Sequence, residues 1–241
     1  MLLKDLLFSF ALLIVLCGTT VRADVLTFSG QSSISSSGVD FGANGLSDGS
    51  FTVASSTGSF TPSGTTGTIK DPNFLSTSPL NQSFLLGSFM TFQSNPNLRI
   101  DLTFIHLGTS GAAGCSVNPP AQFQVCTPTS ALLVTPANPQ GLSPYNFTNL
   151  PGGLSSLSFA VDGNVVNGAV STPFQGVFTT QFTVPYQTIL AALGSGVPIA
   201  LGGTFNTSAA AVPEPATMVL LGSGLVGIAA KVKRRKKQST V

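Results

Sequence analysis

The chain has 241 residues, of which only 7% are charged, whereas ordinary soluble domains have about 25%. Its formal net charge of +2 is unevenly distributed, because six of the ten Lys and Arg lie within residues 231–237. Between residues 24 and 213, Lys70 and Arg99 stand against six aspartates, which gives this part of the chain a net charge of −4. A nucleic-acid-binding domain needs a basic face, so this distribution excludes nucleic acid as a partner.

Residues 1–23 have the layout of a secretory signal peptide. Lys4 precedes an apolar run of 11 residues, LLFSFALLIVL, which small residues and the sequence VRA follow. The run is too short to span a bilayer, so we expect it to be removed by cleavage after Ala23. Two alternatives are an uncleaved anchor and lipidation at Cys17, although the bulky residue directly before this cysteine disfavours lipidation.

Residues 24–203 are expected to form one all-β body, because about 180 residues are ample for a single core. Apolar and polar residues alternate over residues 50–54, 98–106 and 177–184. This period of two is typical of strands with one buried and one wet face. Clusters of Gly, Ser, Asn and Pro separate the strands. The predicted fold is an antiparallel β-sandwich, jelly-roll-like, although the order of its strands does not follow from the sequence.

Local patterns in the body also predict turns, a helix and a core. Asp162-Gly163 and Asn167-Gly168 are dipeptides that favour tight hairpin turns. One or two turns of helix are expected from Tyr186 to Gly194. Sixteen of the 18 phenylalanines fall in the body. Because buried aromatic side chains dominate core packing, we assign six of them to the core: Phe28, Phe51, Phe104, Phe159, Phe178 and Phe182.

Cys115 and Cys126 are the two cysteines that remain once the signal peptide is removed. In an exported protein, an even pair of cysteines predicts a disulfide, which here closes the proline-rich loop CSVNPPAQFQVC. In the chain-entropy model, closing such a loop stabilises the fold by about 2–3 kcal/mol. The sequence has no C-x-x-C motif, so we expect no redox or catalytic role for the pair.

The body lacks the residue combinations of common enzymatic sites. His106 is the one histidine, so any metal site or Ser-His-Asp triad must use it, and Asp101 falls on the opposite face of a regular strand. The sequence has no G-x-S-x-G elbow. Residues 162–168 (DGNVVNG) lack the alternating acids and final Glu of an EF-hand loop, and we interpret them as turns. We therefore expect a protein that is not an enzyme and has neither metal nor cofactor.

The carboxyl-terminal part has the pattern of a membrane anchor. Residues 204–211 are predicted to form a flexible stalk. Residues 216–232 are apolar on all sides, unlike a buried amphipathic helix, and span about 25 Å as a helix, enough for a thin bilayer. A basic tail follows and, by the positive-inside rule, keeps the body outside the cytoplasm. The tail consists of Lys231, Lys233, Arg234, Arg235, Lys236 and Lys237.

Within this anchor, residues 222–227 (GSGLVG) match the G-x-G-x-x-G pattern of a dinucleotide site. Such a motif must follow a strand and precede an acidic residue by about 20 positions. Here Pro213 and Pro215 precede it, and no Asp or Glu follows. The glycines are therefore interpreted as small residues of a membrane helix, where glycine is common.

Residues 212–237 resemble the PEP-CTERM sorting signal of Gram-negative bacteria. The resemblance rests on Val212, Pro213, Glu214 and Pro215, followed by the short apolar helix with its glycines and by the terminal basic tail. It implies that the partner is an exosortase, a membrane transpeptidase with a catalytic Cys that cuts near the Pro-Glu-Pro sequence. It also implies anchoring in the inner membrane, with later transfer to the cell surface or extracellular matrix. The two prolines keep this segment extended, as a protease substrate needs.

The family shares only this signal, so three hypotheses for the body stay open. The first is a structural protein within exopolysaccharide. The second is a carbohydrate-binding module, which would need a groove with exposed aromatic side chains, whereas the sequence has no Trp and only Tyr145 and Tyr186. The third and least favoured is a secreted hydrolase. Extracellular polysaccharide is the partner that the first two hypotheses share.

Overall fold

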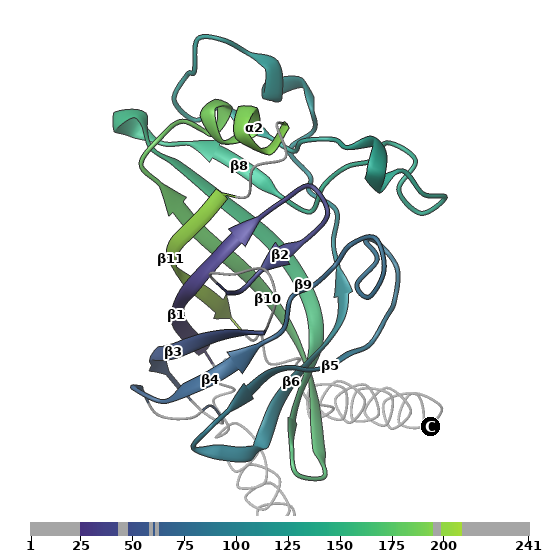
Figure 1. The fold of residues 1–241 in the computed structure, drawn as a ribbon, viewed down its shortest axis with the longest axis vertical. Helices are drawn as coiled ribbons and strands as arrows, with labels where there is room; N and C mark the ends of the chain where they lie inside the picture. The colour runs from purple at the N-terminus through teal and green to yellow at the C-terminus, as the bar shows by residue number, and fades with distance from the viewer. Residues whose placement is uncertain (1–24, 43–47, 58–59, 61–62, 195–198, 209–241) are drawn as a thin grey trace, which may run out of the picture. The chain divides into compact units, whose positions relative to one another are not determined.

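The computed structural model describes residues 25–42, 48–57, 60, 63–194 and 199–208, and Figure 1 shows their arrangement. These residues belong to one compact unit, residues 23–210. The unit consists mostly of antiparallel β-sheet with one short helix, α2 (Tyr186–Gly194). The prediction of an all-β body and that of the helix are both confirmed.

The strands of the described residues form a single sheet in the order β11-β1-β3-β4-β5-β6-β9-β8-β7. In addition, β10 pairs with β9 and β2 pairs with β1. All these pairs are antiparallel. The strands are β1 (Val25–Ile34), β2 (Val39–Asp40), β3 (Gly49–Ser56), β4 (Thr66–Ile69), β5 (Leu86–Phe92), β6 (Asn95–Ile105), β7 (Val125–Cys126), β8 (Asn146–Asn149), β9 (Ser155–Asn167), β10 (Val170–Phe182) and β11 (Ile199–Ser208).

The sheet curls round until β11 lies beside β10 (Figure 1). The expected sandwich of two stacked sheets is therefore replaced by one continuous sheet that encloses its core. Most strands that are neighbours in the chain are also neighbours in the sheet, which is not a jelly-roll order. Register shifts in the pairs β1–β3, β5–β6 and β6–β9 increase the twist and bend the sheet, which explains how one sheet can curve this far.

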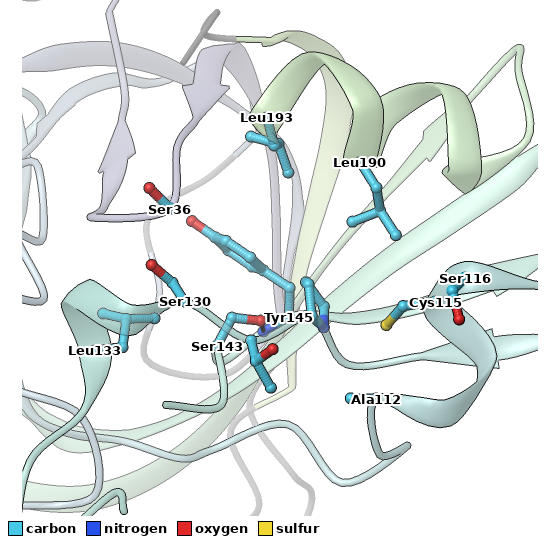
Figure 2. A pocket seen from close by; sticks show the side chains of 12 residues that line it. Ser36, Ala112, Cys115, Ser116, Ser130, Leu133, Ser143, Tyr145, Leu190 and Leu193 are labelled. Carbon is cyan, nitrogen blue, oxygen red and sulfur yellow. Dashed lines mark hydrogen bonds between the residues drawn. The ribbon is translucent and has the colours of Figure 1, made fainter. Parts of the chain in front are cut away.

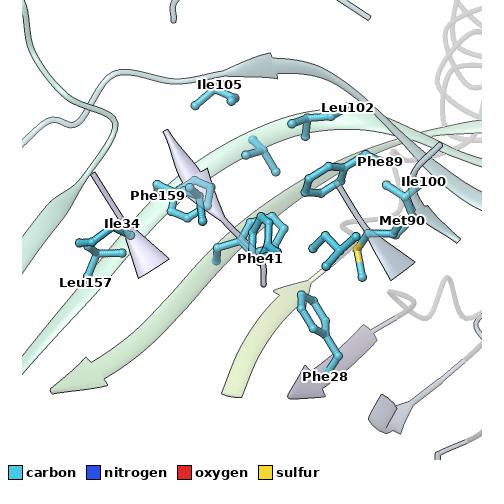
Figure 3. Close-up of a cluster of buried hydrophobic side chains, with 14 of the residues drawn as sticks. Phe28, Ile34, Phe41, Phe89, Met90, Ile100, Leu102, Ile105, Leu157 and Phe159 are labelled. Atoms are coloured by element: carbon cyan, nitrogen blue, oxygen red, sulfur yellow. The ribbon is translucent and has the colours of Figure 1, made fainter. Parts of the chain in front are cut away.

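The core within the curved sheet is built on phenylalanine rings, several of which are labelled in Figure 3. Phe178 of β10 lies at its centre: the ring centroids of Phe28, Phe41, Phe89 and Phe159 are all within 6.0 Å of its own. Strand alternation predicted four of the core residues correctly. These are Phe28, Phe51, Phe159 and Phe178.

Phe104 and Phe182 are only half-buried, in contrast to the prediction. At Phe104 the reason is a register shift, which interrupts the pairing of β6 with β9 between Leu102 and Phe104. The shift reverses the alternation, so that Ile105 faces the core instead. Phe182 is the last residue of β10, where the strand leaves the sheet.

The two predicted turns have different outcomes. β9 and β10 are joined by the two residues after Asn167, and Gly168 has a φ of 60°, so this hairpin is confirmed. The turn predicted at Asp162-Gly163 is wrong, and residues 162–167 of the segment interpreted as turns lie within β9. A Cβ atom at Gly163 would collide with the carbonyl oxygen of Asp101 and with the ring of Phe174. Close packing between strands therefore requires this glycine.

The boundary of the body also differs from the prediction. β11 continues to Ser208, which pairs with Val25 of β1. Most of the stalk expected over residues 204–211 is therefore strand, because its backbone completes the ladder with β1. No helix of the described part is long and apolar enough to cross a membrane. The predicted signal peptide, the sorting motif Val212–Pro215, the anchor helix and the basic tail lie outside the described residues.

Candidate functional site

The described residues form several cavities that are large enough for a small ligand, and two of these are the candidates for a binding site. The first, of about 460 Å³, lies below α2 and is lined by hydroxyl groups and leucines (Figure 2). We call it the hydroxyl-lined cavity. No described residue of its lining is an Asp, Glu, His, Lys or Arg. Its lining comprises Ser36, Ser116, Thr129, Ser130, Ser143, Tyr145, Leu133, Leu190 and Leu193, together with Ala112, Cys115 and Pro128.

The polar group of Tyr145 is not available to a ligand in the hydroxyl-lined cavity. The side chain is buried, and its hydroxyl donates to the carbonyl oxygens of Ser35 at 3.2 Å and Gly38 at 2.9 Å. Burial raises the pKa of this hydroxyl well above its usual range, so the group stays neutral. Tyr145 therefore links the loop before β8 to the turn between β1 and β2.

The predicted disulfide is confirmed and lies beside this cavity. Cys115 is bonded to Cys126, with their Cα atoms 4.9 Å apart. Cys126 lies in β7 and pairs with Phe147 of β8, so the bond attaches the proline-rich loop to the edge of the sheet. The hydroxyl of Tyr186 donates to the carbonyl oxygen of Gly114 at 2.8 Å and connects α2 to the same loop. The contacts around the disulfide therefore indicate a structural role for the two cysteines.

The second cavity, of about 630 Å³, lies where β6 ends against β9 and β10. We call it the His106 cleft. It combines polar side chains from loops and strands with an apolar surface. The polar residues are Asn81, His106, Thr109, Asn146, Asp162 and Gln175, and the others are Leu107, Ala160, Val161, Gly176 and Val177.

A pair of ionisable side chains distinguishes this cleft. The Nε2 atom of His106 and the Oδ2 atom of Asp162 are 2.9 Å apart, and their side chains are 43% and 32% exposed. The centroid of the Phe104 ring lies 4.8 Å from the centroid of the imidazole, so the phenyl ring packs against it. The pairing of β6 with β9 creates this contact: the backbone N–H of His106 donates to the carbonyl oxygen of Ala160, two residues before Asp162.

The sequence did not predict this pair. The acidic residue considered as a partner of His106 was Asp101, but its carboxylate lies elsewhere. Asp101 accepts hydrogen bonds from the Nε of Arg99 at 3.1 Å and from the backbone N–H of Ser88 at 2.6 Å. Asp162 is 56 positions from His106. No local signal could have found it, because the partner depends on which strand lies beside β6 and in which register.

Asn146 fixes the loop at one side of the cleft. Its Oδ1 atom accepts hydrogen bonds from the backbone N–H groups of Thr109 at 2.7 Å and Ser110 at 3.2 Å. The same atom accepts from the hydroxyls of Ser110 at 3.2 Å and Thr127 at 2.9 Å. Satisfied networks of this kind make a polar site rigid. Asn146 and the loop at Thr109 are therefore held in place before a ligand arrives.

The described side chains offer recognition chemistry in this cleft. Within the described ranges, no Ser or Thr hydroxyl is hydrogen-bonded to the imidazole of His106. Within the same ranges, no group of three or more His, Cys, Asp or Glu could hold a metal ion. A His–Asp pair with exposed edges can both donate and accept hydrogen bonds. The arrangement suits a ligand that presents several hydroxyl groups.

The described residues define a mostly antiparallel β protein with one short helix. The chain carries the PEP-CTERM protein-sorting motif, which matches residues 211–235. The resemblance seen in residues 212–237 is thereby confirmed. The motif implies an exported protein that is anchored in a membrane and then processed by an exosortase. Comparisons with curated proteins and with solved structures gave no match.

Proposed function

We propose that the protein is a non-enzymatic component of the cell surface or extracellular matrix, with a body that has a structural role within exopolysaccharide. The observation that carries this proposal is the sorting motif at residues 211–235. The signal peptide is removed after Ala23, and the segment 216–232 then holds the chain in the inner membrane. The exosortase cuts near Pro213-Glu214-Pro215, which separates the body from the basic tail.

The outer surface of the sheet supports a role among hydrated polysaccharides. Ser50 and Thr52 of β3 face solvent and pair with Thr68 and Thr66 of β4, so their hydroxyls form a neutral polar ladder. The hydroxyls of Thr68 and Thr91 extend it to β5 at 2.7 Å. Such a surface exchanges hydrogen bonds with water and sugar hydroxyls without fixed charge.

The end of the sheet is compatible with the proposed cut. β11 is paired up to Ser208, and Pro213 follows five residues later. A residue paired in a sheet is a poor protease substrate, because cleavage needs a free extended segment. The cut at the Pro-Glu-Pro sequence would therefore leave the whole sheet intact in the mature protein.

The test is fractionation of cells with and without the exosortase, followed by mass spectrometry of the carboxyl terminus. We expect the mature secreted form to lack residues 231–237, and the form in cells without exosortase to retain them in the membrane fraction. A variant with Glu214→Ala and Pro215→Ala should accumulate uncut, whereas Asp48→Asn, an exposed change in the body, should be processed normally. An intact basic tail on the secreted form would overturn the sorting proposal.

A second candidate function is carbohydrate binding, which the His106 cleft favours because it combines fixed polar groups with an apolar surface. A hydrolase would also need a nucleophile or a second acid beside the His106–Asp162 pair. The carbohydrate hypothesis is the one that the geometry of the cleft supports in detail.

A further inference from the structure

We propose that the His106 cleft is a binding site for a neutral saccharide, a segment of uncharged polysaccharide of one to a few sugar units. The proposal rests on the proposed matrix function, because it names the polymer that the body would hold. The cleft encloses about 630 Å³, which falls within the range of small-ligand sites.

The polar groups of the cleft match the chemistry of a sugar ring. A pyranose presents neighbouring hydroxyls that donate and accept hydrogen bonds at the same time. Asp162 is an acceptor, His106 offers a second ring nitrogen beyond the one bonded to Asp162, and Gln175 is an exposed amide with both functions. Asp162 lies in β9, Gln175 lies in β10 and His106 directly follows β6, and all three line the same cleft.

The apolar part of the lining provides a surface for the C–H groups of the ring. Val177 of β10 is 40% exposed, and the half-buried Ala160 and Leu107 line the cleft nearby. The sugar ring would contact aliphatic side chains here and not a broad aromatic face. Such a contact removes less apolar surface from water and therefore contributes less to binding. We therefore expect affinity in the weak range, strengthened by several copies of the site along one polymer.

Charge selects a neutral ligand over an acidic one. The lining contains Asp162 and neither Lys nor Arg. The two basic side chains of the described body are engaged elsewhere: Arg99 pairs with Asp101, and the Nζ of Lys70 donates to the carbonyl oxygen of Gly87 at 2.7 Å. A uronic acid or a phosphate would meet the carboxylate of Asp162 with no lysine or arginine in the described lining to offset it, and like charges repel. His106, the one basic side chain of the lining, is already bonded to that carboxylate.

The hydroxyl-lined cavity is a weaker candidate for the same ligand. Its aromatic residue, Tyr145, is buried, and the tyrosine hydroxyl is bonded to two backbone carbonyls. Its remaining polar groups are single hydroxyls among leucines, without a carboxylate or an amide in the lining. A carboxylate–hydroxyl hydrogen bond is stronger than one between two neutral groups, so the His106 cleft is better equipped.

The test uses the full-length chain in detergent, so that its result does not depend on exosortase processing. Calorimetry measures binding of neutral hexose oligosaccharides of two to six units, and of oligouronates of the same lengths. We expect binding of at least one neutral series, weaker by about tenfold or more for Asp162→Asn and for Gln175→Ala. His106→Ala should have a similar effect.

Matched controls separate the cleft from the rest of the surface. Asp48→Asn removes an exposed carboxylate and Gln93→Ala an exposed amide, both outside the cleft lining, and each should bind within about twofold of wild type. Thermal unfolding monitors the fold of every variant. Asp162→Asn changes the shape of its side chain least, so it tests the proposal even where His106→Ala fails to fold.

Several outcomes would overturn the proposal. These are no binding of any neutral series, equal binding of oligouronates, or full affinity in Asp162→Asn. Cleavage of the oligosaccharide that His106→Ala abolishes would also overturn it, because the cleft would then be catalytic. The two proposals fail separately: normal processing without saccharide binding rejects the cleft assignment alone, whereas saccharide binding by a chain that is never cut rejects the sorting proposal alone.

Discussion

The phenylalanine core and the segment of residues 107–154 are stabilised in different ways. The core is apolar: Phe178 contacts rings from several strands, and the sheet curls around it. The segment 107–154 contains the short strands β7 and β8, three short 3-10 helices (Ala113–Ser116, Ala131–Leu133 and Pro151–Gly153) and the disulfide. Of the nine buried polar residues in the described part of the chain, it holds four: Thr127, Asn138, Ser143 and Asn149. Hydrogen bonds and the disulfide, which are directional, fix the loops of this segment, and these loops line both cavities. The core is held by hydrophobic packing, which is not directional.

This contrast predicts that the largest loss of stability comes from the core. Phe178→Ala should lower the free energy of unfolding by about 3–5 kcal/mol, because it removes a buried ring and leaves a cavity. Urea denaturation measures the loss. Val170→Ala on the same strand, at a side chain that is 65% exposed, is the control and should change stability by about 0.5 kcal/mol or less. Equal effects of the two variants would contradict the assignment of the core.

The second prediction concerns the disulfide of the segment 107–154. Replacing Cys115 and Cys126 together by Ser should lower the free energy of unfolding by about 2–3 kcal/mol, because the loop that the bond closes regains its freedom in the unfolded chain. The same denaturation experiment measures it. Reducing agent should destabilise the wild type and leave the double variant unchanged. A wild type that is insensitive to reduction would show that local hydrogen bonds suffice.

The third prediction tests those hydrogen bonds at Asn146. Asn146→Ala removes an acceptor shared by four donors and should lower the free energy of unfolding by about 1–3 kcal/mol. Asn146→Asp keeps the acceptor and should restore part of the loss. Asn73→Ala, which removes one exposed acceptor of the backbone N–H of Leu75, should have a smaller effect. If the two alanine variants lose the same stability, the network around Asn146 does not hold the loop.

The smallest effect is expected from charge at the margin of the core. Burial raises the pKa of Asp71, and the nearby Asp40 and Asp48 add to the shift, while a hydrogen bond from the backbone N–H of Phe41 at 2.7 Å opposes it. The folded protein therefore holds this proton more tightly than the unfolded chain. The stability from Asp71 is present at low pH and is lost as the pH rises through the folded pKa.

Asp71→Asn should remove this dependence on pH and leave stability at neutral pH equal or slightly higher, since an amide oxygen can still accept from Phe41. Thermal unfolding across the acidic range checks it, and Asp48→Asn, which removes one of the charges that raise the pKa of Asp71, should weaken the dependence on pH without removing it. A steeper decline with rising pH in Asp71→Asn than in the wild type would contradict the sign of the shift.

Features of the body that depend on neighbouring residues could be predicted from the sequence. Alternation located β3, β6 and β10, and four core phenylalanines followed from it. The hairpin after Asn167 and helix α2 were visible in short motifs. Predictions failed where strands interact across the sheet: the register shift exposed Phe104, and close packing rather than a turn required Gly163.

The sequence by itself predicted the sorting signal and the disulfide between Cys115 and Cys126. A sorting motif is recognised as a linear segment, so its information lies in the order of residues 211–235. Only the tertiary structure decided that β11 completes the sheet with β1 and that His106 meets Asp162. The physical reason is that a contact between strands depends on their order and register, which the sum of packing over the whole core selects.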